Sequence, residues 1–288
     1  MTIVAIQRQR NNPVHLKNLN LHLFCKNGWC PTPQYGLSCC PRMLKNSQKL
    51  CTVVRKLSSS VRGYYAKMQV APLQEAALEE QCILVDENDR ILGEASKRYC
   101  HRVGEAGNIP LHRAFSVFMF NRKGDLLLQK RSLNKVTFPG HYTNTCCSHP
   151  LAKIPGEIEE EEALGVRRAA QRRLGYELGI PPEQVPVEDF FYLTRIHYQA
   201  PGDGYWGEHE IDYILFLRKD EVTVDPNPDE VSEIRWVSRA SLSDFVKINS
   251  PLSPWFQLVL NHKLLTWWDN LDDLYKFRDH ETIQRFVQ

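Results

Sequence analysis

The stretch EIEEEEALGVRRAAQRRLGYEL, residues 157–178, predicts the clearest helix of the chain. Its acidic residues crowd the first turns and its arginines follow in the later turns, an order that the helix dipole favours. Four apolar residues recur at helical spacing and form the stripe that a core would cover: Ala163, Val166, Ala170 and Leu174. Gly179, followed by Pro181 and Pro182, ends the helix.

Strand-forming sequences lie on both sides of this helix. Before it, apolar runs joined by turn-forming residues predict two hairpins, over residues 82–93 and 112–131. After it, residues 190–198 and 208–218 predict strands around a glycine-rich loop, and residues 234–237 predict a further strand.

Further helices are expected at both ends of this region. Residues 72–81 predict a short entry helix, and two tryptophan-containing helices are expected from about Pro254 and about Asp269. Strands and helices in this mixed order predict an α+β fold, an α/β/α sandwich, in one domain spanning residues 71–288.

The N-terminal segment has a different composition from the rest of the chain. Residues 1–74 contain 11 Lys or Arg and no Asp or Glu, which leaves 25 basic and 34 acidic residues in the remainder. A basic, hydroxylated segment without acids is typical of an organelle transit peptide. We predict a disordered mitochondrial transit peptide over residues 1–70, removed near Arg62 to Tyr65. A start at Met68 would give a cytosolic form.

Other uses of this segment are less consistent with its composition. A nucleic-acid-binding arm or simple disorder is the alternative, but the basic residues are scattered rather than clustered, which argues against the arm. The chain contains no apolar run as long as a bilayer span requires. We therefore expect no nucleic-acid partner and no membrane partner, and we expect a monomer.

The stretch YTNTCCSHP, residues 142–150, holds the first candidate site residues. In an extended backbone residues i and i+2 point the same way, so Cys147 and His149 would face one pocket. The pair would supply a nucleophile or base and a metal ligand. Alternatively, Cys147 is a buried structural cysteine, since free cysteine is among the most buried residue types. Cys146 is expected to be structural.

A second pair of residues predicts a metal site. Glu208 and Glu210 would project to one side of a strand, where two carboxylates repel unless a cation lies between them. His101, His112 and His149 are the candidate nitrogen ligands, although each taken alone would more often be a polar surface group. Three imidazoles and two carboxylates suit Mn²⁺ or Mg²⁺, and Zn²⁺ is an alternative.

Four cations fall at the ends of elements rather than within charge runs: Lys97, Arg131, Lys135 and Arg173. Around one pocket they would match a diphosphate, with arginines offering bidentate contacts. Glu177, one turn after Arg173, would hold a Mg²⁺ that rides on that diphosphate. A surface ion pair between Arg173 and Glu177 is the alternative.

Residues 143–150 and 206–213 together resemble isopentenyl-diphosphate delta-isomerases of the metal-dependent type I family. The likeness extends from about residue 82 to residue 270. The resemblance implies a Nudix-like fold with added N- and C-terminal elements. Residues 172–180 resemble the end of a Nudix box in which Tyr176 replaces the first acid of the usual pair, which counts against diphosphate hydrolysis.

The resemblance implies that the chain interconverts isopentenyl and dimethylallyl diphosphate through a tertiary carbocation. Cys147 and Glu210 would move the two protons, with Tyr198 hydrogen-bonded near Glu210. The family favours protonation from the Glu210 side and deprotonation by the thiolate. A Nudix-type diphosphate hydrolase is the nearest alternative, and a non-catalytic diphosphate-binding module is a more distant one.

The resemblance also assigns ligands to this sequence. It implies diphosphate ligands at Lys97, Arg131, Lys135, Ser148 and Arg173. It implies ligands of the first divalent ion at His101, His112, His149, Glu208 and Glu210, and a ligand of the diphosphate-bound Mg²⁺ at Glu177. Trp255 would face the carbocation, unless it is a core tryptophan.

Overall fold

The computed structural model describes residues 71–286. The predicted transit peptide, its cleavage position and Met68 lie outside these residues, so they stay predictions. The helices and strands, in chain order, are α2 (Pro72–Ala77), β1 (Gln81–Val85), β2 (Ile91–Ser96), α3 (Lys97–His101), β3 (His112–Phe120), β4 (Leu126–Arg131), β5 (Tyr142–Thr143), β6 (Cys146–Ser148), α4 (Leu164–Leu178), β7 (Phe191–Ala200), β8 (Glu208–Arg218), β9 (Val231–Val237), α5 (Leu242–Ile248), α6 (Pro254–Val259), α7 (Leu265–Trp268) and β10 (Asp279–Arg285).

A mixed sheet forms the middle of the fold. Six of its strands follow one another in the order β10-β7-β8-β3-β1-β2, and β4 branches from β3 to pair with β5 and β9. β3 and β8 run parallel, and β7 runs antiparallel to β8. The short β6 pairs with β3 and thereby places Cys147 opposite Ser116.

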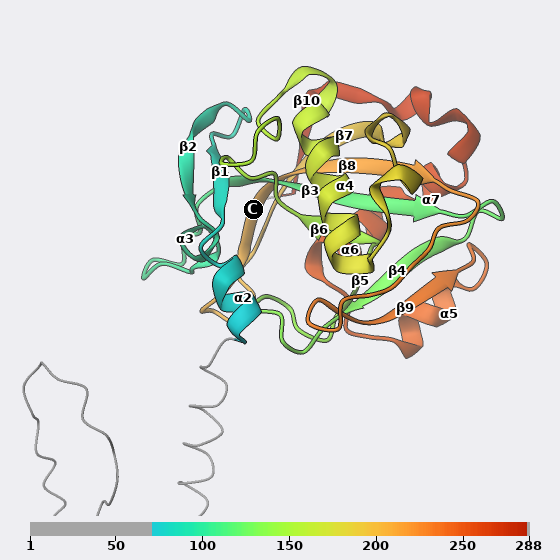
Figure 1. Ribbon diagram of the computed structural model, residues 1–288, viewed down its shortest axis with the longest axis horizontal. Coiled ribbons are helices and arrows are strands. Elements are labelled where there is room, and N and C mark those ends of the chain that lie inside the picture. The colour runs from blue at the N-terminus through green and yellow to red at the C-terminus, as the bar shows by residue number, and fades with distance from the viewer. Residues whose placement is uncertain (1–70, 287–288) are drawn as a thin grey trace, which may run out of the picture. The chain divides into compact units, whose positions relative to one another are not determined.

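Helices cover both faces of the sheet (Figure 1). One core lies between the sheet and α4, and it takes alternate residues of β3 such as Phe115 and Val117. The other core lies between the sheet and α6–α7, and it contains β3 residues from the opposite face of the strand, such as Phe118 and Phe120. Since each face of β3 meets a core, all nine of its residues are buried. The predicted α/β/α sandwich is confirmed.

The predicted helix over residues 157–178 begins later than expected. α4 starts at Leu164, after Glu162 and Ala163 adopt left-handed backbone angles. Glu157 is buried and accepts hydrogen bonds from the Leu151 amide (2.8 Å) and from Arg172 (2.6 and 2.9 Å). The acidic residues therefore form a loop and a short 3-10 helix, Glu161–Ala163, ahead of α4. The carboxylate of Glu157 binds Leu151 and Arg172 instead of the amides of a first helical turn.

Three further expectations need correction. The chain turns between β3 and β4 as predicted, but only Phe120 and Leu126 pair, and β4 pairs mainly with β9. The expected pair of tryptophan-containing helices is one helical run from α6 to α7, followed by a 3-10 helix at Leu271–Phe277. β10, which pairs with β7, was not predicted, because its sequence Asp-His-Glu-Thr-Ile-Gln-Arg is mostly polar.

The entry helix is shorter than predicted, since α2 ends at Ala77 and Gln81 already belongs to β1. The strand predicted over residues 234–237 begins earlier, at Val231. The other expected elements agree with the structure. β1 and β2 form the first hairpin, and β7 and β8 form an antiparallel pair around the glycine-rich loop. Between residues 71 and 286 no helix combines the length and the apolarity that crossing a bilayer needs.

Candidate active site

Three histidines and two glutamates from separate elements meet in one buried cluster. α3 contributes His101, β3 contributes His112, the residue after β6 is His149, and β8 contributes Glu208 and Glu210. Their ligand atoms all lie within 4.8 Å of one another, and all five residues are buried. The register between β3 and β8 explains part of this arrangement, because it sets His112 directly opposite Glu210. The predicted convergence of these residues is confirmed.

The hydrogen bonds around the cluster turn its nitrogen atoms inward. His101 Nδ1 lies 2.8 Å from the Lys97 carbonyl, and His112 Nδ1 lies 2.9 Å from the Pro110 carbonyl. A carbonyl only accepts, so each Nδ1 carries a proton, and each Nε2 faces the cluster, where it could bind a metal once it is unprotonated. This arrangement is typical of histidines that bind a metal.

The cluster also contains polar atoms that need a partner. Within the described part of the chain, buried His149 Nδ1 and Glu208 Oε2 make no hydrogen bond, although Glu208 Oε2 lies 3.0 Å from His101 Nε2. Glu210 Oε1 lies 2.9 Å from His149 Nε2. Two buried carboxylates beside inward-facing ring nitrogens fit a divalent cation, which would satisfy them together.

A pocket lies beside this cluster. It is lined by ten of the predicted site residues, together with Val136 and Thr137: Lys97, His101, Arg131, Lys135, Cys147, His149, Tyr198, Glu208, Glu210 and Trp255. A thiol, a carboxylate, cations and an aromatic ring thus share one small space. The surface-group interpretation of the histidines is wrong, because all three are buried.

The two candidate proton-transfer groups both face this pocket. The Tyr198 hydroxyl donates a short hydrogen bond to Glu210 Oε2. Cys147 is half-buried, and its Sγ lies 3.6 Å from Ser116 Oγ, which in turn donates to Asp212 Oδ2 at 2.8 Å. Cys147 therefore belongs to the pocket wall and not to the interior of a core.

The surroundings of these groups set their protonation. Burial raises the pKa of the Cys147 thiol well above its usual range, and the nearby Asp212 and Glu210 carboxylates raise it further. Burial also raises the pKa of Tyr198, which keeps the hydroxyl protonated. For Glu210 burial acts upward on the pKa, but the hydrogen bond and charge of His112 outweigh it and hold the pKa below its ordinary value.

The cationic wall of the pocket is supported by its own contacts. Arg131 donates to the Thr137 carbonyl (2.7 Å) and the Phe138 carbonyl (3.2 Å), and its guanidinium lies 5.3 Å from the centre of the Trp255 ring. The indole N–H of Trp255 donates to Asn144 Oδ1 at 3.1 Å. Trp255 is both a core residue and a pocket residue, so the core interpretation is confirmed, and its role in facing a carbocation stays a prediction.

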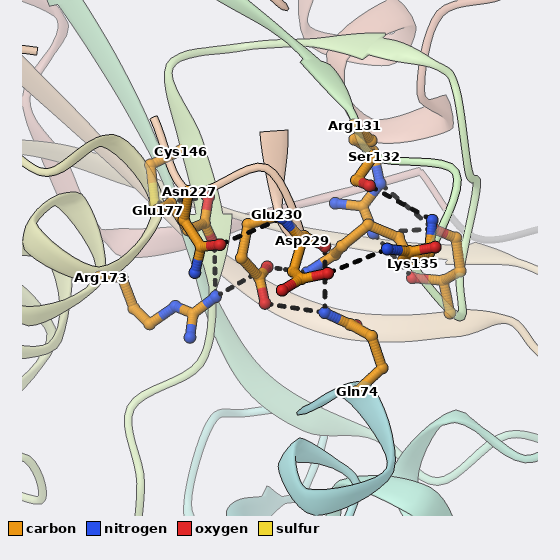
Figure 2. A network of polar contacts seen from close by, with 12 residues as sticks. Gln74, Arg131, Ser132, Lys135, Cys146, Arg173, Glu177, Asn227, Asp229 and Glu230 are labelled. Carbon is orange, nitrogen blue, oxygen red and sulfur yellow. Dashed lines mark hydrogen bonds and ion pairs between the residues drawn. The ribbon is translucent and has the colours of Figure 1, made fainter. Parts of the chain in front are cut away.

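Arg173, Glu177 and Ser148 do not line the pocket. Arg173 and Glu177 form a buried ion pair at 2.6 Å, so the surface-pair alternative is wrong. Ser148 follows Cys147 in β6, so its side chain points to the opposite face from the thiol. Figure 2 shows that the carboxylate of Glu230 lies between Arg173 and Lys135 and contacts both.

Sequence reasoning missed three polar residues of this region. Asp212 lies two residues after Glu210 in β8, so strand alternation alone would have found it. Gln129 donates to Glu177 Oε2 at 3.0 Å and lies in β4, directly after the three leucines that begin this strand. Glu230 precedes β9 in a loop, and no local pattern distinguishes it from a surface acid.

Comparison with known proteins identifies the family. Residues 110–256 match the NUDIX domain, which confirms the Nudix-like fold. The chain is 53% identical over 216 residues to isopentenyl-diphosphate delta-isomerase 1 of Mesocricetus auratus, covering 74% of this chain and 94% of the relative. It is 55% identical over 202 residues to the chloroplastic isopentenyl-diphosphate delta-isomerase I of Arabidopsis thaliana, covering 67% and 68%. The chain belongs to the isopentenyl-diphosphate delta-isomerase family.

Proposed function

We propose that the protein interconverts isopentenyl and dimethylallyl diphosphate in isoprenoid biosynthesis. The observation that carries this proposal is the pocket in which Cys147 and the Glu210–Tyr198 pair face the same space as a group of cations. The family name of the relatives, which are more than 50% identical, supports the same reaction.

The reaction makes a specific demand on the protein. Protonation of the terminal alkene carbon gives a tertiary carbocation, and loss of a proton from the neighbouring methylene gives the allylic product. One acid and one base on opposite sides of a five-carbon chain are needed. Trp255 offers its ring to the cation, a contact worth about 2 kcal/mol when water is excluded.

Glu210 with Tyr198 forms one proton-transfer unit, and Cys147 forms the other. The Glu210–Tyr198 unit protonates the alkene of isopentenyl diphosphate, and the sulfur of Cys147 takes the proton from the methylene. Because the reaction is reversible, the thiol of Cys147 is the donor in the opposite direction. Its raised pKa suits both directions, because the thiolate is then a strong base for the methylene proton, and the thiol that results keeps this proton until the reverse reaction returns it.

Two divalent ions complete the proposed site. The first would be Mn²⁺, Mg²⁺ or Zn²⁺, held by His101, His112, His149, Glu208 and Glu210. The second would be a Mg²⁺ that accompanies the diphosphate, held by Glu177. When bound, the first ion supplies positive charge that tunes the acidity of Glu210. The diphosphate is bound by Lys97, Arg131, Lys135, Arg173 and Ser148. The enzyme acts as a monomer.

A Nudix-type diphosphate hydrolase fits the geometry less well. Tyr176 stands where the Nudix box usually has an acid, and its side chain is exposed. Glu177, the remaining acid of that pair, is proposed to hold the Mg²⁺ that accompanies the diphosphate. Few carboxylates are left here for the metal-activated water that hydrolysis needs.

Turnover in deuterated water tests the reaction directly. Isopentenyl diphosphate incubated with the protein and a divalent ion should give dimethylallyl diphosphate that carries deuterium, detected by mass spectrometry, with no release of phosphate. Release of phosphate would support the hydrolase. An unchanged, unlabelled substrate would support the binding module.

The N-terminal segment carries a separate proposal, that it directs the chain to mitochondria. Chloroplastic relatives support an organelle address for proteins of this family, while the composition of residues 1–74 favours mitochondria. A reporter fused after residue 74 should enter mitochondria, and a fusion that begins at Met68 should stay cytosolic. A cytosolic or plastid location of the longer fusion would reject the proposal.

A further inference from the structure

Glu230 lies at the centre of a buried charge network that the reaction does not by itself require. One carboxylate oxygen, Oε2, accepts from Lys135 Nζ at 2.5 Å and from Arg173 at 3.3 Å. The other, Oε1, accepts from Gln74 Nε2 at 2.8 Å. Figure 2 shows the carboxylate between the two cations, with Gln74 reaching it from α2. Both oxygens are therefore occupied.

The two cations, Lys135 and Arg173, come from separate parts of the chain, and both contact the carboxylate of Glu230. Lys135 lies in the loop between β4 and β5, and Arg173 lies on α4. The side chains of Lys135, Arg173 and Glu230 are at most 9% exposed. Two buried like charges repel, and a carboxylate between them offsets that repulsion if it is fully hydrogen-bonded. Glu230 meets this condition.

We propose that Glu230 is a positioning residue for diphosphate binding: its carboxylate holds Lys135 charged and in place beside Arg173. This inference rests on the proposed function, because both cations belong to the proposed diphosphate site. Glu230 acts through Lys135 and Arg173 and need not touch the substrate.

The charges around Lys135 explain why its ionisation depends on Glu230. Burial is the largest effect and lowers the pKa of Lys135 to about 8, while Glu230 and, more weakly, Glu177 act upward and Arg131 and Lys97 act downward. For Glu230 burial alone would raise the pKa, but Lys135 and Arg173 outweigh it and lower the pKa to about 2. Glu230 is thus ionised at neutral pH, and its removal lowers the pKa of Lys135 further.

The sign of the expected effect follows. A lysine whose pKa falls loses its charge at a lower pH, so the variant loses diphosphate affinity as the pH rises through a range in which the wild-type protein keeps it. Each pH unit above the pKa reduces the charged fraction of a lysine about tenfold. Below that range both proteins carry a charged Lys135, and their affinities converge.

The test is Glu230→Gln, which keeps the size of the side chain and one acceptor oxygen for Lys135 and Arg173 but removes its charge. KM for isopentenyl diphosphate and the Kd for inorganic diphosphate with Mg²⁺, by calorimetry, are measured from pH 6 to pH 9. We expect the ratio of variant to wild-type KM, and likewise of Kd, to rise about tenfold across this range, with a much smaller change in kcat. A ratio that stays flat with pH overturns the inference.

Two further variants keep this result specific. Asp229→Asn removes the same charge one residue away, from a side chain that bonds Asn134 Nδ2 at 3.0 Å, and its ratio should stay flat. In a Lys135→Arg background, Glu230→Gln should give no pH-dependent ratio, because a guanidinium stays protonated. A persistent pH dependence there would overturn the role assigned to Lys135. Thermal melts identify any variant that fails to fold.

The outcome also separates this inference from the proposed function. If the wild-type protein binds neither inorganic diphosphate nor isopentenyl diphosphate, the proposed function fails. If the wild-type protein binds both and Glu230→Gln matches it at every pH, only the role of Glu230 fails.

Discussion

Cys146 and Cys147 are neighbours in the sequence with opposite surroundings. Strand alternation turns Cys147 toward the pocket, where its Sγ lies 3.6 Å from Ser116 Oγ. Cys146 is fully buried on the other face, with its Sγ 3.5 Å from Glu177 Oε2. The same atom type therefore lines the pocket at one position and packs in a core at the next.

Cys147→Ala should lower kcat by about 10²–10⁴-fold, the range that a positioned acid or base contributes. The Kd for inorganic diphosphate should change little, because the thiol is not among the groups proposed to bind the diphosphate. Steady-state kinetics and calorimetry measure the two quantities. Cys146→Ala, as the matched variant, should lower kcat far less. Near-normal turnover by Cys147→Ala would refute the assignment of this residue.

For single residues, the sequence predicts which side chains lie together when they are close in the chain. The two-residue period of a strand is enough to pair Cys147 with His149 and Glu208 with Glu210. The contacts of Glu230 with Lys135 and Arg173 span 95 and 57 residues, so no local period records them. Such contacts depend on tertiary packing, which a single sequence does not show.

Among the elements, α4 carries Arg173 and Glu177 and ends at a glycine that cannot easily be replaced. Gly179 has φ +63°, and a Cβ there would lie 2.4 Å from the Asp225 carbonyl oxygen. Gly175, one turn earlier in the same helix, leaves room, since its Cβ would lie 3.5 Å from the nearest atom, the Ile180 carbonyl oxygen. The two glycines therefore differ in backbone demand and in space.

Gly179→Ala should lower the free energy of unfolding by more than about 1 kcal/mol, because alanine resists a positive φ and the added carbon collides with backbone. Gly175→Ala should raise it by about 0.5–1 kcal/mol, because alanine favours the interior of a helix. Urea denaturation measures both. Equal effects of the two substitutions would contradict this account of the helix end.

The ends of α4 also show what a sequence predicts about elements. Its C-terminus is marked by glycine and proline, and the prediction there is confirmed. Its N-terminus was predicted too early, because the acids of residues 157–162 suit a first turn equally well until the bonds of Glu157 to Leu151 and Arg172 are known. Gly165 fits that loop closely, since a Cβ there would lie 2.3 Å from the Glu157 carbonyl oxygen.

For the whole molecule, the order of strands and helices was enough to predict the α/β/α sandwich, because both faces of an apolar sheet must be covered. The pairing of strands was harder to predict. β4 leaves β3 to join β9, and polar β10 adds to the edge at β7. Both arrangements join segments far apart in the chain. The site forms where these elements meet, so its histidines were predictable as a set and its supporting charges were not.

The cluster of three histidines and two glutamates joins α3, β3, β8 and the end of β6, so an ion bound there should stabilise the whole domain. A ligand that binds only the folded state adds about 2.7 kcal/mol at a concentration 100 times its Kd. In a domain of this size each kcal/mol raises Tm by about 2–4 °C. Protein treated with a chelator should therefore gain about 5–10 °C when Mn²⁺, Mg²⁺ or Zn²⁺ is restored, measured by calorimetry.

Two histidine variants separate binding at the cluster from binding elsewhere. His101→Ala removes an inward-facing Nε2 and should abolish most of the gain in Tm. His262→Ala changes an exposed histidine outside the cluster and should keep the full gain. Glu208 and Glu210 explain why an ion should raise Tm. Without the ion their buried carboxylates repel each other, and with the ion bound both carboxylates are attracted to it. No gain with any of the three ions, or an equal gain in His101→Ala, would show that the cluster is not the metal site.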